Sequence, residues 1–327
     1  MKNAVVVTVG AKNESLGALK LARWLRREGW TVSERTSIGL FDHFDLYCLS
    51  AVFSWRLPAL CDMALIAKET HGGDVWIGGP AVTFHSDNAA FVKARTGITP
   101  VLGLDPRFDD EPGQYPMVYF SRGCPAYSPA CGTCPVPRLE GTSFTYYPNA
   151  SPAAMLLDSN LSALPIARQE EFIERYRVEW PAGRKVDANS GFEPHSFDEG
   201  TLRRWQAFPL ACWRFGYDDL KERSEALAMM DLFAEAGISG DKVRVYTLIG
   251  NEPREACEQR VREVIDRGFH PWPQRLRPLN WISGPLPTFH GWDEPTLIAF
   301  QRFYSIAGLW KGNRPEEFYY QGRYPLA

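Results

Sequence analysis

The sequence predicts an α/β protein in which a small doubly wound parallel sheet precedes a partial parallel (β/α)6-type barrel. One observation behind this prediction is that short β-branched segments alternate with longer segments of helical periodicity along most of the 327 residues. Another is that the alternation pauses at 96–113, where Gly, Pro and acidic residues occur without a period. We therefore expect two α/β units joined by a linker.

The first unit is expected within residues 1–110. Its elements, in chain order, are a strand at 5–9, a helix at 16–27, a strand at 46–49, a helix at 58–69 and a strand at 75–78. Gly29 ends the first helical pattern, and the last strand runs into Gly78-Gly79-Pro80. Three successive strand segments separated by helices predict a small parallel sheet.

The second unit is expected within residues 111–280. Its strands are expected at 117–120, 155–158, 185–189, 212–215 and 242–249, and its helices at 166–180, 198–208, 220–236 and 252–267. Gly237 and Gly268 follow two of these helices, and Pro253 opens the last, which is the usual asymmetry of helix ends. Five or six successive βα units favour a closed or partly closed parallel barrel over a sandwich.

The composition changes near the C-terminus, and we expect residues 281–327 to form an extension that packs on the barrel. Prolines and tryptophans are frequent from residue 271 onward, and one helix is expected at 294–309. Most of these tryptophans are expected to be packing residues, although Trp281 and Trp292 could instead line the mouth of a site. The arginines of 254–277 are expected on a solvated helix face with local ion pairs. The alternative is that Arg275 and Arg277 contact a phosphate or carboxylate on a substrate.

Composition narrows the class of protein. The chain has 36 Lys and Arg against 39 Asp and Glu, a net charge of −3, so general nucleic-acid binding is not expected. No apolar stretch is long enough to span a bilayer, and the first residues fit a strand better than a signal peptide. The odd number of cysteines, seven, argues against a disulfide framework. We expect a protein of the reducing cytoplasm, without membrane attachment.

The cysteines fall into two groups. Four are isolated and are expected to be small buried residues, namely Cys48, Cys61, Cys212 and Cys257. The other three share the segment SRGCPAYSPACGTCPVP with the spacing C-x6-C-x2-C, directly after the strand expected at 117–120, and they are Cys124, Cys131 and Cys134. Thiolates at such spacing bind zinc or iron–sulfur clusters.

A [4Fe–4S] cluster is the preferred ligand of this loop. Structural zinc normally takes four protein ligands, and the nearest histidine, His85, lies outside the loop. Three cysteines can instead hold three irons of a [4Fe–4S] cluster and leave the fourth iron open. A zinc site with a remote fourth ligand, in a non-enzymatic binding protein, is the alternative.

The loop resembles the cluster motif of the radical S-adenosylmethionine (radical SAM) enzymes. The resemblance rests on three cysteines after the first barrel strand, preceded by Arg122-Gly123. The family's usual spacing is C-x3-C-x2-C with an aromatic residue before the last cysteine, whereas here the first gap is six residues and Thr133 holds the aromatic position. The resemblance implies reductive cleavage of S-adenosylmethionine to a 5′-deoxyadenosyl radical. It also implies an external electron donor of the flavodoxin or ferredoxin type and a small-molecule, nucleotide or peptide substrate.

Segments after the loop are similar to later strands of the same family. They are 155–160, 187–193, 213–218 and 246–252. The resemblance implies that their polar ends hold S-adenosylmethionine, with these candidate contacts: Asn160, Asn189, Glu193, Arg214, Ile249 and Gly250. Arg214 would pair with the cofactor carboxylate, and Ile249 and Gly250 would lie near the adenine. The alternative is that each polar residue caps a loop or turn. No catalytic residue is assigned.

The first unit resembles the Rossmann-like cobalamin-binding domain that precedes the barrel in one class of radical SAM enzymes. The order of elements and Gly78-Gly79-Pro80 carry the resemblance, but the D-x-H-x-x-G signature is absent, since residues 10–15 read Gly-Ala-Lys-Asn-Glu-Ser. A remnant scaffold without cobalamin is therefore preferred, because Gly-rich turns also serve the geometry of the sheet. A cobalamin-dependent methyltransferase is the alternative.

Overall fold

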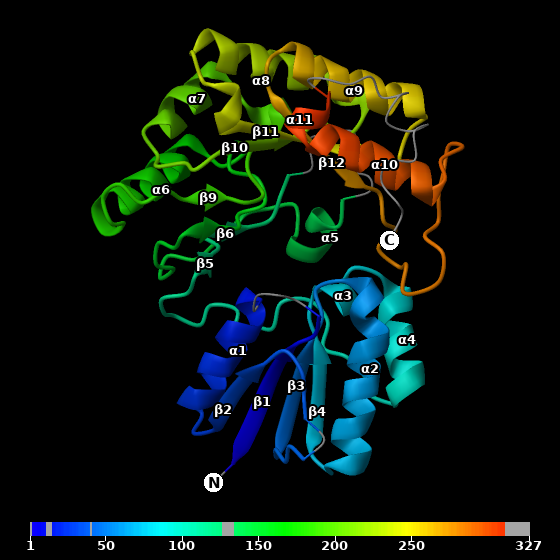
Figure 1. Ribbon diagram of the computed structural model, residues 1–327. Coiled ribbons are helices and arrows are strands. Elements are labelled where there is room, and N and C mark those ends of the chain that lie inside the picture. Colours follow the sequence, from blue (N-terminus) through cyan, green and yellow to red (C-terminus); the bar gives the residue numbers. More distant parts are fainter. Residues whose placement is uncertain (1, 11–14, 40, 126–133, 311–327) are drawn as a thin grey trace.

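The computed structural model describes residues 2–10, 15–39, 41–125 and 134–310 (Figure 1). Strands β1 to β4 and their helices form one part of the molecule, and β5 to β12 form the other. Parallel strands followed by helices dominate both parts, so the predicted α/β class is confirmed. In the described parts of the chain, no helix is long and apolar enough to cross a membrane.

The N-terminal part contains a four-stranded parallel sheet in the order β2-β1-β3-β4. The strands are β1 (Asn3–Thr8), β2 (Thr31–Arg35), β3 (Leu46–Ser50) and β4 (Asp74–Gly78). Side chains of β1 alternate between two apolar clusters, because successive residues of a strand point to opposite faces. Val5 and Val7 belong to one cluster, and Ala4 and Val6 belong to the other.

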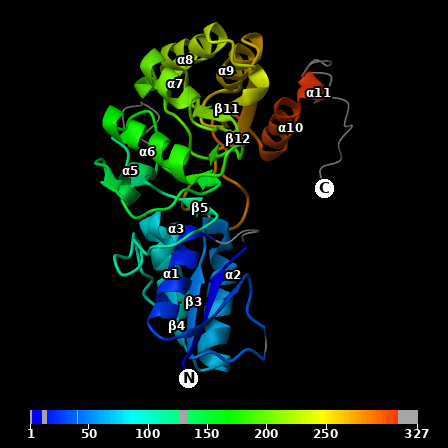
Figure 2. The ribbon, with the colours of Figure 1, turned by 90° about the vertical axis from the view of Figure 1, so that its left-hand side faces the viewer.

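Helices cover both faces of this sheet, as Figure 2 also shows. Helix α1 (Leu16–Arg27) packs on the Ala4 and Val6 side, and α2 (Leu57–Leu65) packs on the other side. Two more helices complete that second layer, α3 (Pro80–Thr83) and α4 (Ser86–Thr96). The sequence analysis missed β2 and α4. Strand β2 is a half-exposed edge strand of sequence TVSER and lacks an apolar signal.

The second part contains a row of parallel strands in chain order. Its strands are β5 (Met117–Val118), β8 (Met155–Leu156), β9 (Asp187–Ala188), β10 (Trp213–Gly216), β11 (Val243–Ile249) and β12 (His270–Arg275). The first three form one sheet and the last three another. Parallel bridges Val186↔Leu210 and Phe192↔Phe215 connect the two sheets.

The strand expected at 117–120 is shorter than predicted. The backbone N–H groups of Phe120 and Ser121 donate to the buried Asp158 carboxylate instead of to a neighbouring strand. The chain therefore leaves the sheet after β5. It continues as β6 (Ser121–Arg122), which pairs antiparallel with β7 (Thr145–Tyr146).

Helices pack along the second part. They are α5 (Val136–Glu140), α6 (Ile166–Glu179), α7 (Glu199–Gln206), α8 (Arg223–Glu235) and α9 (Arg254–Asp266). Short 3-10 or π segments occur at Ser54–Arg56, Ile66–Thr70, Pro194–Ser196, Leu220–Glu222 and Gly240–Lys242. The core between α6 to α8 and the strands is rich in aromatic residues, including Trp205, Trp213 and Phe233.

The helix expected at 294–309 is interrupted at Ile306, so that α10 (Glu294–Ser305) precedes α11 (Ala307–Trp310). Helix α10 lies beside β12 and α9 at one side of the second part (Figures 1 and 2). Trp292 is buried in the apolar cluster between α9 and α10 and is a packing residue.

The two parts meet where β3 and β12 end. Ser54 Oγ, in the turn after β3, donates a 2.6 Å hydrogen bond to the Trp281 carbonyl oxygen. The Arg277 guanidinium lies 4.5 Å from the centroid of the Trp55 ring, and Asn88 Nδ2 donates to the Leu279 carbonyl oxygen at 2.9 Å. The carboxyl ends of these two strands therefore face one junction.

Candidate functional site

Cys124 follows β6 and comes directly after Gly123, whose backbone conformation strongly favours glycine. Gly123 has φ +107°, and a Cβ at this position would lie 2.3 Å from the Ser143 carbonyl oxygen. The Cys124 N–H donates to the Gly141 carbonyl oxygen at 3.1 Å, and the Cys124 side chain is buried. The conformation of Gly123 and the Cys124 N–H therefore fix the backbone that leads into the first candidate ligand.

Glu140, at the end of α5, ties the start of the cysteine loop to the chain that follows it. Its Oε1 accepts from Arg122 Nη1 at 3.0 Å, and its Oε2 accepts from the Gly123 N–H at 3.1 Å and from Ser159 Oγ at 2.9 Å. One carboxylate thus links β6, α5 and the loop after β8.

A series of polar contacts links Arg122 to the N-terminal part. Arg122 lies 3.6 Å from the Asp109 carboxylate, and Asp109 also accepts a hydrogen bond from the Tyr147 hydroxyl. Lys20, on α1, donates to the Asp109 carbonyl oxygen and lies over the Tyr147 ring. Burial lowers the pKa of Lys20 and raises that of Tyr147. The strand that leads into the cysteine loop is therefore anchored to helix α1.

Cys134 lies just before α5, and its side chain is half-buried and free. Burial raises the pKa of the Cys134 thiol, and the neighbouring Cys124, Asp218 and Glu140 raise it further. Cys131, the third candidate ligand, lies outside the described residues. The described residues contain no group of three metal-binding side chains, and the set of three cysteine ligands stays a prediction.

The isolated cysteines behave as the sequence predicts. Each is buried and free, and they are Cys48, Cys61, Cys212 and Cys257. Burial raises the pKa of all four thiols. The expectation that these four cysteines are small buried residues is confirmed.

Asn160 lies directly beside Cys124. Its Nδ2 is 3.5 Å from Cys124 Sγ, and its Oδ1 accepts from the Ala163 N–H at 3.0 Å and from Ser162 Oγ at 3.2 Å. The nearby Asp158 carboxylate holds the turn after β5, and burial raises its pKa to about 6. Asn160 thus contacts a candidate ligand of the cluster, and its predicted contact with S-adenosylmethionine stays a prediction.

The candidates on β9 are placed differently from one another. Asn189 follows the strand and has an exposed side chain. The Glu193 carboxylate accepts the N–H groups of His195 at 2.9 Å and Ser196 at 3.0 Å, and so caps a short turn. Glu193 therefore has a structural role that the sequence analysis kept as its alternative.

Arg214 lies within β10, before the carboxyl end of that strand. Its Nη2 is 2.7 Å from Asp187 Oδ2, and its Nη1 donates to the Tyr246 hydroxyl. Among the described residues, the buried Arg214 Nε and Asp187 Oδ1 have no hydrogen-bond partner. Nη1 and Nη2 of Arg214 are thus hydrogen-bonded within the protein, whereas its Nε has no acceptor.

Ile249 and Gly250 end β11. The Ile249 side chain is fully buried in the cluster with Cys257 and Val261, so only its backbone remains for a cofactor. Gly250 has φ +89°, and a Cβ there would lie 3.2 Å from Leu297. The glycine is therefore required by the turn itself, and a role beside adenine stays a prediction.

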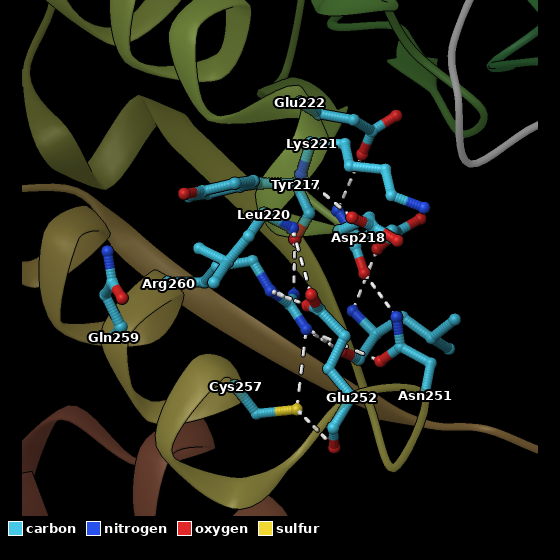
Figure 3. A network of polar contacts seen from close by, with 12 residues as sticks. Tyr217, Asp218, Leu220, Lys221, Glu222, Asn251, Glu252, Cys257, Gln259 and Arg260 are labelled. Carbon is cyan, nitrogen blue, oxygen red and sulfur yellow. Dashed lines mark hydrogen bonds and ion pairs between the residues drawn. The ribbon is translucent and has the colours of Figure 1, made fainter.

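Arg260 is a buried residue that the sequence analysis assigned incorrectly. The arginines of 254–277 were expected on a solvated helix face, but Arg260 is 0% exposed. Figure 3 shows its polar contacts. It donates to the Tyr217 and Leu248 carbonyl oxygens, each at 2.7 Å, and to Glu252 Oε2 at 2.9 Å. Its helical spacing from the apolar Cys257, Val261 and Val264 is the signal that could have placed it inward.

The Arg260 network joins the loops after β10 and β11. Asp218 Oδ1 accepts from the Leu248 N–H at 2.8 Å, and Asn251 Nδ2 donates to the Asp218 carbonyl oxygen at 2.6 Å (Figure 3). Asp218 is also the residue whose charge acts on Cys134. One polar network thus connects the ends of β10 and β11.

Comparison with known proteins places this architecture in a class of α/β folds. No family model and no curated protein matches the chain. Among solved structures, the fold is similar to that of a radical S-adenosylmethionine methyltransferase. That structure is TsrM from Kitasatospora setae with cobalamin and a [4Fe-4S] cluster bound, which aligns with a TM-score of 0.59 and 13% identity over 86% of this chain and 74% of TsrM. At this identity the likeness shows the fold.

Proposed function

We propose that this protein is a radical SAM enzyme in which Cys124, Cys131 and Cys134 bind three irons of a [4Fe–4S] cluster. The observation that supports the proposal is that the buried Cys124 follows β6 and the free Cys134 precedes α5, in a fold similar to TsrM. The described donors fit such a cluster, because Cys124 and Cys134 are both free and cysteine thiolates are the usual ligands of iron–sulfur clusters.

The proposal includes a division of the chain. Residues 1–110 are a Rossmann-like domain, 111–280 are a partial (β/α)6 barrel, and 281–327 are a C-terminal extension. The order of β5, β8, β9, β10, β11 and β12 along one row supports the barrel, and the separate apolar clusters on either side of the linker support the first boundary.

The chain's own residues would orient S-adenosylmethionine at the strand ends. When bound and reduced, the cluster supplies the electron that cleaves this cofactor to a 5′-deoxyadenosyl radical. Arg214 would pair with the cofactor carboxylate through its partly exposed guanidinium, and the exposed Asn189 can contact a ribose hydroxyl. Glu193, Asn160 and the backbone of Ile249 and Gly250 complete the proposed set.

Anaerobic reconstitution tests the proposal. We expect about four irons per chain from a single cubane cluster, an electron paramagnetic resonance signal after reduction, and 5′-deoxyadenosine on addition of S-adenosylmethionine. Cys131→Ala should lose the cluster, whereas Cys212→Ala, at an isolated buried position, should retain it. Wild-type protein that holds zinc and no iron would instead support a structural metal clip.

A cobalamin-dependent methyltransferase is the second candidate. TsrM was solved with cobalamin bound, and the likeness to it covers most of this chain. The junction between β3 and β12 also brings the carboxyl ends of both parts together, where α/β sheets bind ligands. Cobalamin would bind without a histidine from the absent D-x-H-x-x-G motif. Near-stoichiometric retention of cobalamin through gel filtration is the expected result, and no retention would reject this candidate.

The remaining parts of the proposal concern partners. We propose an external donor of the flavodoxin or ferredoxin type, a substrate that is a small molecule, nucleotide or peptide, and action in the cytoplasm. The proposed donor class is tested by mixing the reconstituted protein with reduced flavodoxin or ferredoxin. Reduction of the cluster is monitored by its optical absorbance.

A further inference from the structure

The amide of Asn160 has only one orientation that satisfies its neighbours. The backbone N–H of Ala163 and the hydroxyl of Ser162 both lie at the same end of the side chain, at 3.0 and 3.2 Å. A backbone N–H can only donate, so the end that it contacts must be the carbonyl oxygen. The NH2 group therefore points the other way.

That NH2 group points at the sulfur of Cys124. Asn160 Nδ2 lies 3.5 Å from Cys124 Sγ, and both side chains are buried, with Asn160 only 2% exposed. Water therefore has little access to compete for this contact. A thiolate is a much better acceptor than a thiol, because a charged acceptor strengthens the hydrogen bond.

We propose that Asn160 is a positioning residue that donates an N–H···S hydrogen bond to the Cys124 thiolate and thereby raises the reduction potential of the cluster. The inference rests on the proposed function and deepens it. Hydrogen bonds to sulfur stabilise the more electron-rich, reduced cluster, so loss of the donor shifts the potential to more negative values. A residue that only caps the 160–163 turn would not change the potential.

Two variants separate the donor from the turn cap. Asn160→Asp keeps the oxygen that accepts from Ala163 but replaces the donor with a negative charge. Asn160→Ala removes the donor without adding charge. Ser162→Ala is the matched control, because it removes a contact to the oxygen of Asn160 and leaves the NH2 group in place.

The experiment is an anaerobic redox titration of the reconstituted holoproteins, followed by electron paramagnetic resonance. We expect the midpoint reduction potential of the cluster to be more negative in Asn160→Ala and Asn160→Asp than in the wild type, with the larger shift for Asn160→Asp. We expect an unchanged potential in Ser162→Ala. Unshifted midpoints in both Asn160 variants overturn the inference. A wild-type protein without any cluster overturns the proposed function instead.

A measurement on the wild type covers the case in which the variants fail to hold a cluster. Protein grown with asparagine labelled with 15N in the side chain is reduced and studied by pulsed electron paramagnetic resonance. We expect a 15N coupling to the cluster spin, because a hydrogen bond to a cluster sulfur carries spin density to the donor nitrogen. Absence of that coupling overturns the inference without any variant.

Discussion

The Glu140 carboxylate lies 3.0 Å from the Arg122 guanidinium and also accepts the Gly123 N–H at 3.1 Å. Arg122 and Gly123 precede the first candidate ligand, and Glu140 follows the last one by six residues. Both side chains of the ion pair are at most 10% exposed, so the pair is shielded from water. The two ends of the cysteine loop are therefore closed by a buried ion pair.

Removing this carboxylate should weaken the loop. Glu140→Gln leaves the buried Arg122 without its closer charged partner, which should cost about 1–3 kcal/mol of unfolding free energy. We also expect faster loss of iron from the reconstituted protein, since the loop ends are no longer held. Chemical denaturation and release of iron to a chelator measure the two effects.

The exposed Glu179 provides the control for this prediction. Glu179 pairs with Arg175 at 3.5 Å on the surface of α6, far from the loop in sequence. Glu179→Gln should leave both stability and iron release close to the wild type. Equal behaviour of the two variants would mean that the ion pair does not close the loop.

Gly123 should not tolerate a side chain. Gly123→Ala adds a Cβ that would meet the Ser143 carbonyl oxygen, at a φ of +107° that alanine rarely adopts. We expect loss of iron binding together with lower thermal stability. Gly237 also has a positive φ, +67°, but a Cβ there would meet no atom within 4 Å. Gly237→Ala should therefore cost only about 1–2 kcal/mol and retain iron. Normal iron binding by Gly123→Ala would contradict this account.

Glu222 should give the protein a dependence of stability on pH. Burial raises the pKa of this carboxyl to about 7, with further contributions from Asp218 and Glu193. The folded state then holds a proton that the unfolded state has already released above its ordinary pKa near 4.5. The contribution of Glu222 to the free energy of unfolding is therefore fully present below about pH 4.5. It is lost as the pH rises from about 4.5 to 7.

Replacing Glu222 by Gln tests that sign. Glu222→Gln stays uncharged, so its unfolding free energy should exceed that of the wild type by more at pH 8 than at pH 5, by up to about 3 kcal/mol. Urea denaturation at both pH values measures the difference. Glu235→Gln, at an exposed position on α8, is the control and should show no such change. A difference that does not vary with pH would contradict the assignment.

Long apolar elements were predictable from the sequence, and contacts across the chain were not. Strand β11 was expected because Val243 and Val245 alternate with polar residues, and helix α9 because Gly268 follows it. Strand β2 was missed because an edge strand keeps polar side chains. The contact between Asn160 and Cys124 spans 36 residues and depends on how two loops fold, which no local pattern encodes.

Arg260 shows why a charged residue can be misassigned. A guanidinium on a helix is normally solvated, yet five donors can satisfy several carbonyl oxygens at once. Here they bind two backbone carbonyls and one carboxylate at the ends of β10 and β11 (Figure 3). These contacts offset the cost of burying the charge. The conformation of the two loops therefore depends on Arg260, and the burial of Arg260 depends on the two loops.

Substitution of Arg260 should therefore be far more costly than substitution of its neighbour Arg262. Arg260→Met leaves the Tyr217 and Leu248 carbonyl oxygens without this donor and Glu252 without its cation, which should destabilise the fold by about 3–5 kcal/mol. Arg262→Met removes an exposed pair with Glu258 on the same helix and should cost less than about 1 kcal/mol. Thermal unfolding of both variants measures the difference. Similar midpoints for the two would show that the buried network does not hold the loops after β10 and β11 in place.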